Sequence, residues 1–192
     1  VPPSPVAAPG AAATDKYSPQ ELDELVGPIA LYPDQVIASL LPATNYPLNV
    51  IQAARYVEGA QGKVEGVPPE GEGWDPSVQA LLQYPDVLAW MNENIDWMEQ
   101  VAYAVAVQQA EVLGAIQAFR RKVNEAGNLT TNEYQTVTVE EAPVEASATA
   151  EGGDTVIVIE PTNPEVVYVP SYNPAYVSQP VYGAPVAPLY GW

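Results

Sequence analysis

Prolines are so frequent in the first half of this chain that only short helices fit between them. The chain contains 21 prolines among 192 residues. A proline inside a helix lacks an amide donor and crowds the preceding turn. Pro28 and Pro33 therefore limit a first helix, which begins at Ser18 and Pro19 with Glu21 completing a capping box. Further short helices are expected over residues 34–41 and 48–57, after Asp75, and from Pro85.

One segment, from about Asp96 to Ala126, is expected to form a much longer helix. Basic residues fill its last turns, where the helix dipole favours them, and Gly127 is a candidate C-cap. At 1.5 Å per residue this helix would reach roughly 45 Å. It is expected to be either the spine of the domain or a surface shared with another molecule. The apolar residues at three- and four-residue steps are Met98, Val101, Val105, Val112, Ile116, Phe119 and Val123.

After the long helix, the pattern changes to the two-residue alternation of β-strands. Residues 134–140, 154–160 and 165–169 are rich in β-branched and aromatic side chains. The short link 161–164 predicts that the second and third of these strands pair as a hairpin. The two or three strands are expected to expose an edge that the chain does not cover, and such edges recruit partners.

These patterns predict an α+β fold with a mainly helical N-terminal domain, one long helix and a small antiparallel β hairpin or meander. The apolar fraction of 47% is that of a globular chain, which can form a core. Sixteen extended residues reach about 50 Å, enough for the first segment to leave its domain. The four parts are an extended Pro/Ala arm over residues 1–16, a helical domain over 17–127, a β region over 128–170 and a Tyr/Pro-rich C-terminal arm over 171–192.

Charge and missing side chains exclude large classes of function. Acidic residues number 24 against 6 basic ones, for a formal net charge of -18, which opposes binding to nucleic acid or to an anionic membrane. The absence of His and Cys removes thiolate or imidazole zinc sites, iron–sulfur clusters and imidazole-dependent triads. No run approaches the ~18 apolar residues of a transmembrane helix. We therefore expect no cofactor and no enzymatic activity.

Acidic clusters are the remaining candidates for catalysis or cation binding. Glu93 and Asp96 lie near a helix start, and paired carboxylates hydrolyse glycosidic bonds in many enzymes. Trp90 and Trp97 flank this pair and offer a sugar platform, although such residues usually belong to a core. Acidic residues also favour helix starts for electrostatic reasons alone, so a carboxylate-based hydrolase is only a third hypothesis. The acidic segment 70–75 matches no calcium loop, which favours weak screening by divalent cations over a dedicated metal site.

The two Pro-rich ends have the composition of docking arms. Proline favours the polyproline II conformation, whose backbone polar groups point outward. Tyrosine adds a large contact area at low rotamer cost and a hydroxyl group for hydrogen bonding. Composition alone also fits a disordered linker. If the arms dock, the expected subunit contacts are Val1, Pro3, Val6, Pro9, Tyr172, Tyr176, Tyr182, Tyr190 and Trp192.

Four segments, in order along the chain, carry a resemblance to a known family. They are ELDELVGPIALYPDQVIASLLPATNYPLNVIQAARYV, WDPSVQALLQYPDVLAWMNENIDW, GNLTTNEYQTV and TVIVIEPTNPEVVYVPSYNP, within about residues 20–178. They resemble a family of secreted bacterial proteins, the domain of unknown function 3300 family. The resemblance implies export from Gram-negative bacteria, a helical part, a short β part and a Tyr/Pro-rich tail, with no reaction and no catalytic residue. The lipid-carrying N-terminal Cys of some members is missing, which favours a released protein.

The first residue, Val1, is not Met, which fits removal of a signal peptide. We therefore expect a secreted protein, extracellular or periplasmic, with a structural and non-catalytic role. Its expected partner is itself, in an oligomer or an extracellular filament held by arm exchange and strand-edge contacts. The alternative is a periplasmic or outer-membrane binding or scaffold module for another envelope protein.

Overall fold

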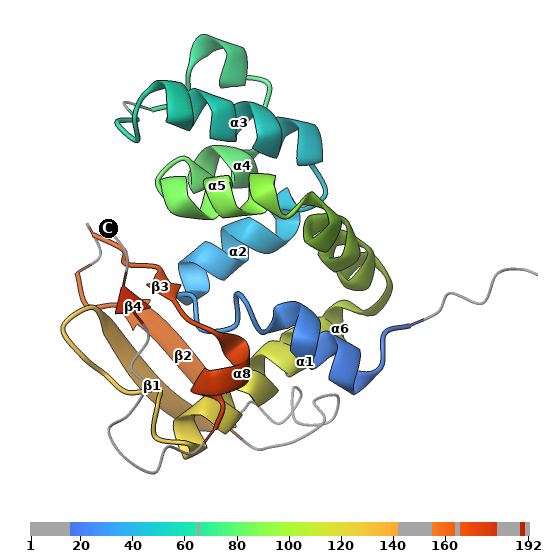
Figure 1. The fold of residues 1–192 in the computed structure, drawn as a ribbon, viewed down its shortest axis with the longest axis vertical. Helices are drawn as coiled ribbons and strands as arrows, with labels where there is room; N and C mark the ends of the chain where they lie inside the picture. Colours follow the sequence, from blue (N-terminus) through green and yellow to red (C-terminus); the bar gives the residue numbers. More distant parts are fainter. Residues whose placement is uncertain (1–15, 65, 142–154, 164–165, 180–188, 191–192) are drawn as a thin grey trace, which may run out of the picture.

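Helices form most of the fold, and a two-stranded hairpin closes one end of it (Figure 1). The computed structural model describes residues 16–64, 66–141, 155–163, 166–179 and 189–190. Helices α3, α4 and α5 stack at the end opposite the hairpin, with α1, α2 and α6 between them (Figure 1). The expected α+β class, with one long helix and an antiparallel hairpin, is confirmed.

The element bounds follow the proline pattern closely. Five of the first six α-helices are short, and four of these five carry proline in their first turn. The expected capping box is present, since Ser18 accepts from the Glu21 amide and Glu21 accepts from the Ser18 amide at 2.8 Å. The helices are α1 (Pro19–Val26), α2 (Asp34–Ala43), α3 (Pro47–Gly59), η1 (Pro69–Gly71), α4 (Pro76–Leu81), α5 (Pro85–Glu93), α6 (Ile95–Glu125) and α8 (Pro174–Val177).

The long helix α6 is the spine of the domain, but it is not straight. Gln108 has non-helical backbone angles, φ -150° and ψ 50°, which divide the helix into two segments. The expected apolar stripe faces the core on both sides of this break, from Met98 to Val123. Gly127 ends the helix with a φ of 78°, a left-handed conformation that glycine adopts without steric cost.

The pairing of the strands differs from the sequence-based expectation. Strand β1 (Gln135–Glu141) pairs antiparallel with β2 (Thr155–Pro161), with Val137 opposite Ile159. The expected hairpin between residues 154–160 and 165–169 is wrong, because residues 166–169 form no strand beyond a single bridge from Val166 to Asn163. Instead, β3 (Pro170–Ser171) pairs with β4 (Leu189–Tyr190).

The physical reason is that the outer edge of β2 already has hydrogen-bond partners. Side chains of α6 already hydrogen-bond the backbone of Ile157, on the edge of β2 that faces away from β1. Ile157 and Ile159 are at most 1% exposed, so this face of the hairpin is part of the core. One of the two edges of the hairpin, that of β2, is therefore covered by a helix, which is one of the ways in which proteins protect strand edges.

Candidate functional site

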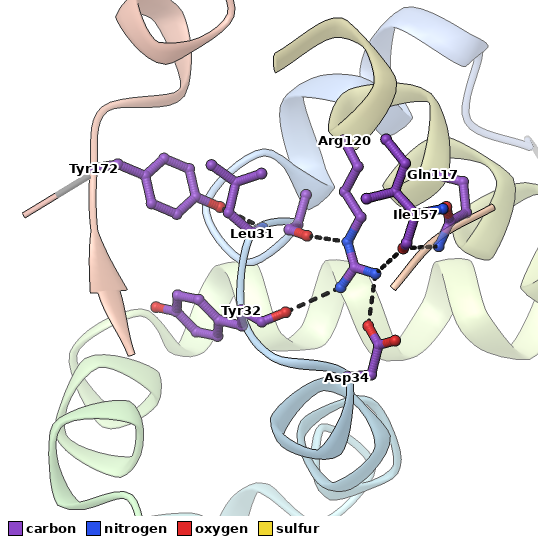
Figure 2. A network of polar contacts seen from close by, with 8 residues as sticks. Leu31, Tyr32, Asp34, Gln117, Arg120, Ile157 and Tyr172 are labelled. Carbon is purple, nitrogen blue, oxygen red and sulfur yellow. Dashed lines mark hydrogen bonds and ion pairs between the residues drawn. The ribbon is translucent and has the colours of Figure 1, made fainter. Parts of the chain in front are cut away.

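A buried arginine joins four parts of the chain at the centre of the fold. Figure 2 shows the Arg120 guanidinium between the α1–α2 connection, α2 and β2. Its Nε donates to Ala30 O at 2.7 Å, its Nη2 to Tyr32 O at 3.0 Å and its Nη1 to Ile157 O at 2.7 Å. Nη1 also lies 2.6 Å from Asp34 Oδ1. The arginine is 1% exposed, so its hydrogen bonds stabilise the fold and it does not bind solvent.

The prolines explain why an arginine is needed there. Pro28 and Pro33 interrupt helical hydrogen bonding between α1 and α2, which leaves buried carbonyls in the connection without helical donors. A guanidinium carries five donors in a fixed fork and can serve several carbonyls at once. Burial lowers the pKa of Arg120 below its usual value, while the charge of Asp34 opposes that shift. Arg120 thus binds the proline-rich connection to α6 and β2.

The first residues of the predicted C-terminal arm are held by the same connection. The Tyr172 hydroxyl donates to Gly27 O at 2.6 Å and accepts from Leu31 N at 3.1 Å (Figure 2 shows the contact with Leu31). Burial raises the pKa of the Tyr172 phenol well above its usual value. A Cβ on Gly27 would lie 3.1 Å from Cβ of Pro174, so the missing side chain allows α8 to approach. Tyr172 therefore contacts its own chain.

Replacing Tyr172 with phenylalanine is expected to lower the free energy of unfolding by about 1–3 kcal/mol, since two buried backbone groups lose their partner. Chemical denaturation followed by tryptophan fluorescence measures this change. Tyr176→Phe is the matched control, because Tyr176 is 63% exposed and the same change there is expected to cost about 0.5 kcal/mol or less. Equal effects of the two changes would contradict the assigned role of the Tyr172 hydroxyl.

Two glutamines of α6 each pair with the backbone of a distant residue. Gln117 donates to Ile157 O at 3.2 Å and accepts from Ile157 N at 2.8 Å. Gln108 donates to Tyr17 O at 3.2 Å and accepts from Tyr17 N at 2.8 Å. A side-chain amide that both donates and accepts in this way makes the two hydrogen bonds that a residue of a neighbouring strand would make with the same backbone. The bend in α6 falls at one of these two pairing residues.

The segment before α1 is fastened to the same helix. Lys16 forms an ion pair with Glu111 at 2.7 Å, and the hydrogen bond from Lys16 lowers the pKa of Glu111 below its usual value. The Tyr17 ring meets Tyr103 edge to face, with ring centroids 6.1 Å apart. Together with the Gln108 pairing, these contacts fasten the start of the described fold, at Lys16 and Tyr17, to α6.

An uncharged groove runs between α2 and the second segment of α6. Its volume is about 620 Å³. Buried Ile37, Leu41 and Ile116 form its apolar lining, and Leu113 stands at its wall with 45% of its surface exposed. Among the described residues that line it, the charged ones are Asp34 and Arg120, which neutralise each other. The remaining lining residues are Ala38, Pro42, Asn45, Val105, Gln109 and Gln117. This groove is our candidate site for binding a protein segment.

The expected subunit contacts fall into three groups. Tyr172 lies within the fold and Tyr176 is exposed, whereas Tyr190 belongs to β4. Of these three, Tyr172 makes its contacts within its own chain, while Tyr176 and Tyr190 stay predicted contacts. The other expected contacts lie outside the described residues: Val1, Pro3, Val6, Pro9, Tyr182 and Trp192.

The candidate catalytic pair lies on the protein surface. Glu93 and Asp96 are both exposed. Trp90 and Trp97 pack edge to face with centroids 4.5 Å apart, and the Trp97 indole donates to Leu25 O at 2.8 Å. The two rings therefore join α5 and α6 to α1 rather than forming an open platform. Across the described ranges, no three acidic side chains converge on a position for a metal ion.

The sequence pattern does not predict the tertiary contacts of Arg120, Gln108 and Gln117. Arg120 is one of the basic residues near the end of the long helix, which are predicted only to complement the helix dipole. One signal was available for that residue, because it lies four positions after Ile116, on the buried stripe of the helix. The two glutamines lacked such a signal, since their partners are 91 and 40 residues away.

Comparisons with known proteins place these features in a family context. The family described as "Protein of unknown function (DUF3300)" matches residues 18–190. The uncharacterized protein YacH of Escherichia coli (strain K12) is 33% identical over 183 residues, which cover 84% of this chain and 30% of that protein. No solved structure matches. Among the helices that the structure describes, none is both long and apolar enough to cross a membrane.

Proposed function

We propose that this chain, which belongs to the DUF3300 family of proteins of unknown function, is a secreted, non-catalytic structural protein that self-associates. Its assembled form is a homo-oligomer or an extracellular filament. Export is part of this proposal and is supported by the resemblance to secreted bacterial proteins. The uncharged groove between α2 and α6 is the observation on which self-association rests.

The charge of the chain makes that groove unusual. A net charge of -18 per copy repels other copies at most points of the surface. A groove whose two charges cancel, and whose lining is otherwise apolar and amide, lacks that repulsion. Depletion of charge at the centre of a patch is typical of protein–protein interfaces. Contact between copies at this groove therefore avoids most of that repulsion.

The polar residues at the centre of the fold support a structural role as well. Arg120, Gln108 and Gln117 all bind backbone groups of the same chain. Two carboxylates near the start of the described fold are ion-paired. Glu111 of α6 pairs with Lys16, and Asp23 of α1 pairs with Lys122. These groups are committed to holding the fold, which argues for a scaffold over a catalyst.

A second candidate function is a binding or scaffold module for another envelope protein. It is favoured by one observation, that the chain spans only 30% of YacH. A domain embedded in a longer protein can act by holding a partner of a different sequence. Crosslinking in cells separates the two functions, since self-association gives crosslinks between copies and scaffolding gives a distinct partner.

Assembly is expected to strengthen as ionic strength rises. Repulsion between copies is screened over about 10 Å at 0.1 M salt and over about 30 Å at 0.01 M. Light scattering and electron microscopy of the purified protein from 0.01 to 0.3 M sodium chloride measure the native particle mass. Magnesium chloride at matched ionic strength separates general screening from cation binding. Dispersed monomers at every salt concentration would overturn self-association, and assembly independent of salt would overturn the repulsion argument.

A further inference from the structure

We propose that the groove between α2 and α6 receives the Pro/Ala arm, residues 1–14, of a second copy of this chain. The inference rests on the proposed self-association and names the two surfaces that meet. It assigns the arm a receptor on the described fold, at a groove lined by Ile37, Leu113 and Ile116.

Charge singles out the arm as the matching segment. Residues 1–14 contain no acidic or basic side chain, and their apolar content is Val, Ala and Pro. The acidic segment 142–154 carries Glu145, Glu151 and Asp154, which a neighbouring acidic copy would repel. An uncharged arm in an uncharged groove allows two chains, each with a net charge of -18, to make contact without placing like charges together.

The remaining uncharged segment, residues 180–188, is unsuited to reach another copy. It is tied to the fold at both ends. On one side Asn128 donates to Gln179 O at 3.2 Å, and on the other Leu189 pairs with Ser171. Fixed flanks on both sides limit how far residues 180–188 can extend from their own copy. The arm is therefore the better match of these two uncharged segments.

The arm and the groove also agree in length. The α6 residues along the groove run from Val105 to Arg120, a rise of about 22 Å at 1.5 Å per residue. Residues 1–9 hold four prolines and span about 28 Å in the polyproline II conformation. The proline-rich half of the arm is thus long enough to fill the groove.

Hydrogen bonding fits a proline-rich occupant. Prolines have no amide hydrogen, so the groups of such a segment that need partners are mostly carbonyls. The exposed amide side chains of Gln109 and Asn45 stand on the lining of the groove and can donate to them. Val1 and Val6 offer branched side chains to the apolar floor.

Helix geometry favours the arm of a second copy over the chain's own arm. Lys16 is held at Glu111, and at 3.6 residues per turn that position is about 200° around α6 from Leu113. The groove therefore opens on the opposite side of the helix from the start of the arm. A chain's own arm would have to turn around α6 before it could enter.

The test uses a peptide of residues 1–16 with a photoreactive benzophenone in place of Val6, added to the full-length protein. Crosslinks are expected on α2 and α6 at the groove, and excess unmodified peptide is expected to reduce assembly. Leu113→Glu is expected to weaken both peptide capture and assembly by about tenfold or more, because it places a carboxylate in an apolar contact. Leu48→Glu is the matched control, since Leu48 lies on α3 with 72% of its surface exposed.

The benzophenone at position 6 of the whole protein then identifies the copy that is captured. With a mixture of isotopically light and heavy chains, light–heavy crosslinks are expected to dominate. Crosslinks confined to single chains, or a Leu113→Glu variant that folds and assembles as the parent does, would overturn the inference and leave self-association standing. Peptide capture at the groove by a protein that stays monomeric would instead overturn the proposed function.

Discussion

Replacing Arg120 with methionine is expected to lower the free energy of unfolding by about 3–5 kcal/mol. The change removes the donors of Ala30 O, Tyr32 O and Ile157 O, and each buried carbonyl without a partner costs about 1–3 kcal/mol. Asp34 contributes less to the loss, because its side chain is 43% exposed and water can solvate it. Denaturant unfolding followed by tryptophan fluorescence measures the change.

Two further variants separate charge from geometry at this position. Arg120→Lys keeps the charge but replaces a planar fork by a single ammonium group, so a loss close to that of methionine is expected. Lys122→Met removes an exposed ion pair with Asp23 from the same turn of α6 and is expected to cost about 1 kcal/mol or less. A methionine variant at position 120 as stable as the Lys122 variant would contradict the central role of Arg120.

Deleting residues 1–14 is expected to abolish assembly while leaving the fold intact. Lys16, Tyr17 and the capping box remain in the shortened chain, which keeps every core residue that the structure describes. The melting temperature is therefore expected to stay within about 2 °C of the parent value, which corresponds to well under 1 kcal/mol. Circular dichroism measures the melting temperature, and light scattering measures the particle mass.

A chain with residues 1–14 replaced by glycine and serine at equal length is the control for this deletion. It keeps the reach of the arm but lacks the valines and prolines, so it is also expected to remain monomeric. Normal assembly of the glycine–serine chain would show that length alone is needed. Normal assembly of the shortened chain would remove the arm from the mechanism of self-association.

Local signals in the sequence predict the helices well. Proline sets most of the short helix bounds, while α6 lies in a stretch without proline between Pro85 and Pro143. The caps at Ser18 and Asp75 also act within three residues of the helices they begin. Such features depend on backbone geometry that neighbouring residues fix, so no knowledge of the tertiary fold is needed.

The strand pairing could not be predicted in the same way. A short link favoured pairing of β2 with the segment just after it, which is the more local choice. The side chains of Gln117 and Arg120 occupy that edge of β2, and both lie on a helix 37–40 residues away in sequence. The bend at Gln108 has the same origin, because the Tyr17 backbone that it binds is 91 residues distant.

The candidate site was predicted only in part. The apolar, uncharged arm was visible in composition, but the groove requires α2 and α6 to lie side by side. Leu113 falls outside the buried stripe of the long helix and is exposed beside the buried Ile116. Tyr172 was assigned to a contact between subunits, whereas its hydroxyl binds Gly27 and Leu31 of its own chain. Composition identifies a segment suited to contacts, but the fold decides which contacts it makes.

The fastening of residues 16 and 17 has a mechanical consequence. Tension applied through residue 15 enters the domain at Lys16 and Tyr17, and both residues are joined to α6 rather than only to the short helix that follows them. The Gln108 amide and the Glu111 ion pair share that force one turn apart on the same helix. The pull is thereby passed to the longest element of the fold, before α1 can be peeled from the core.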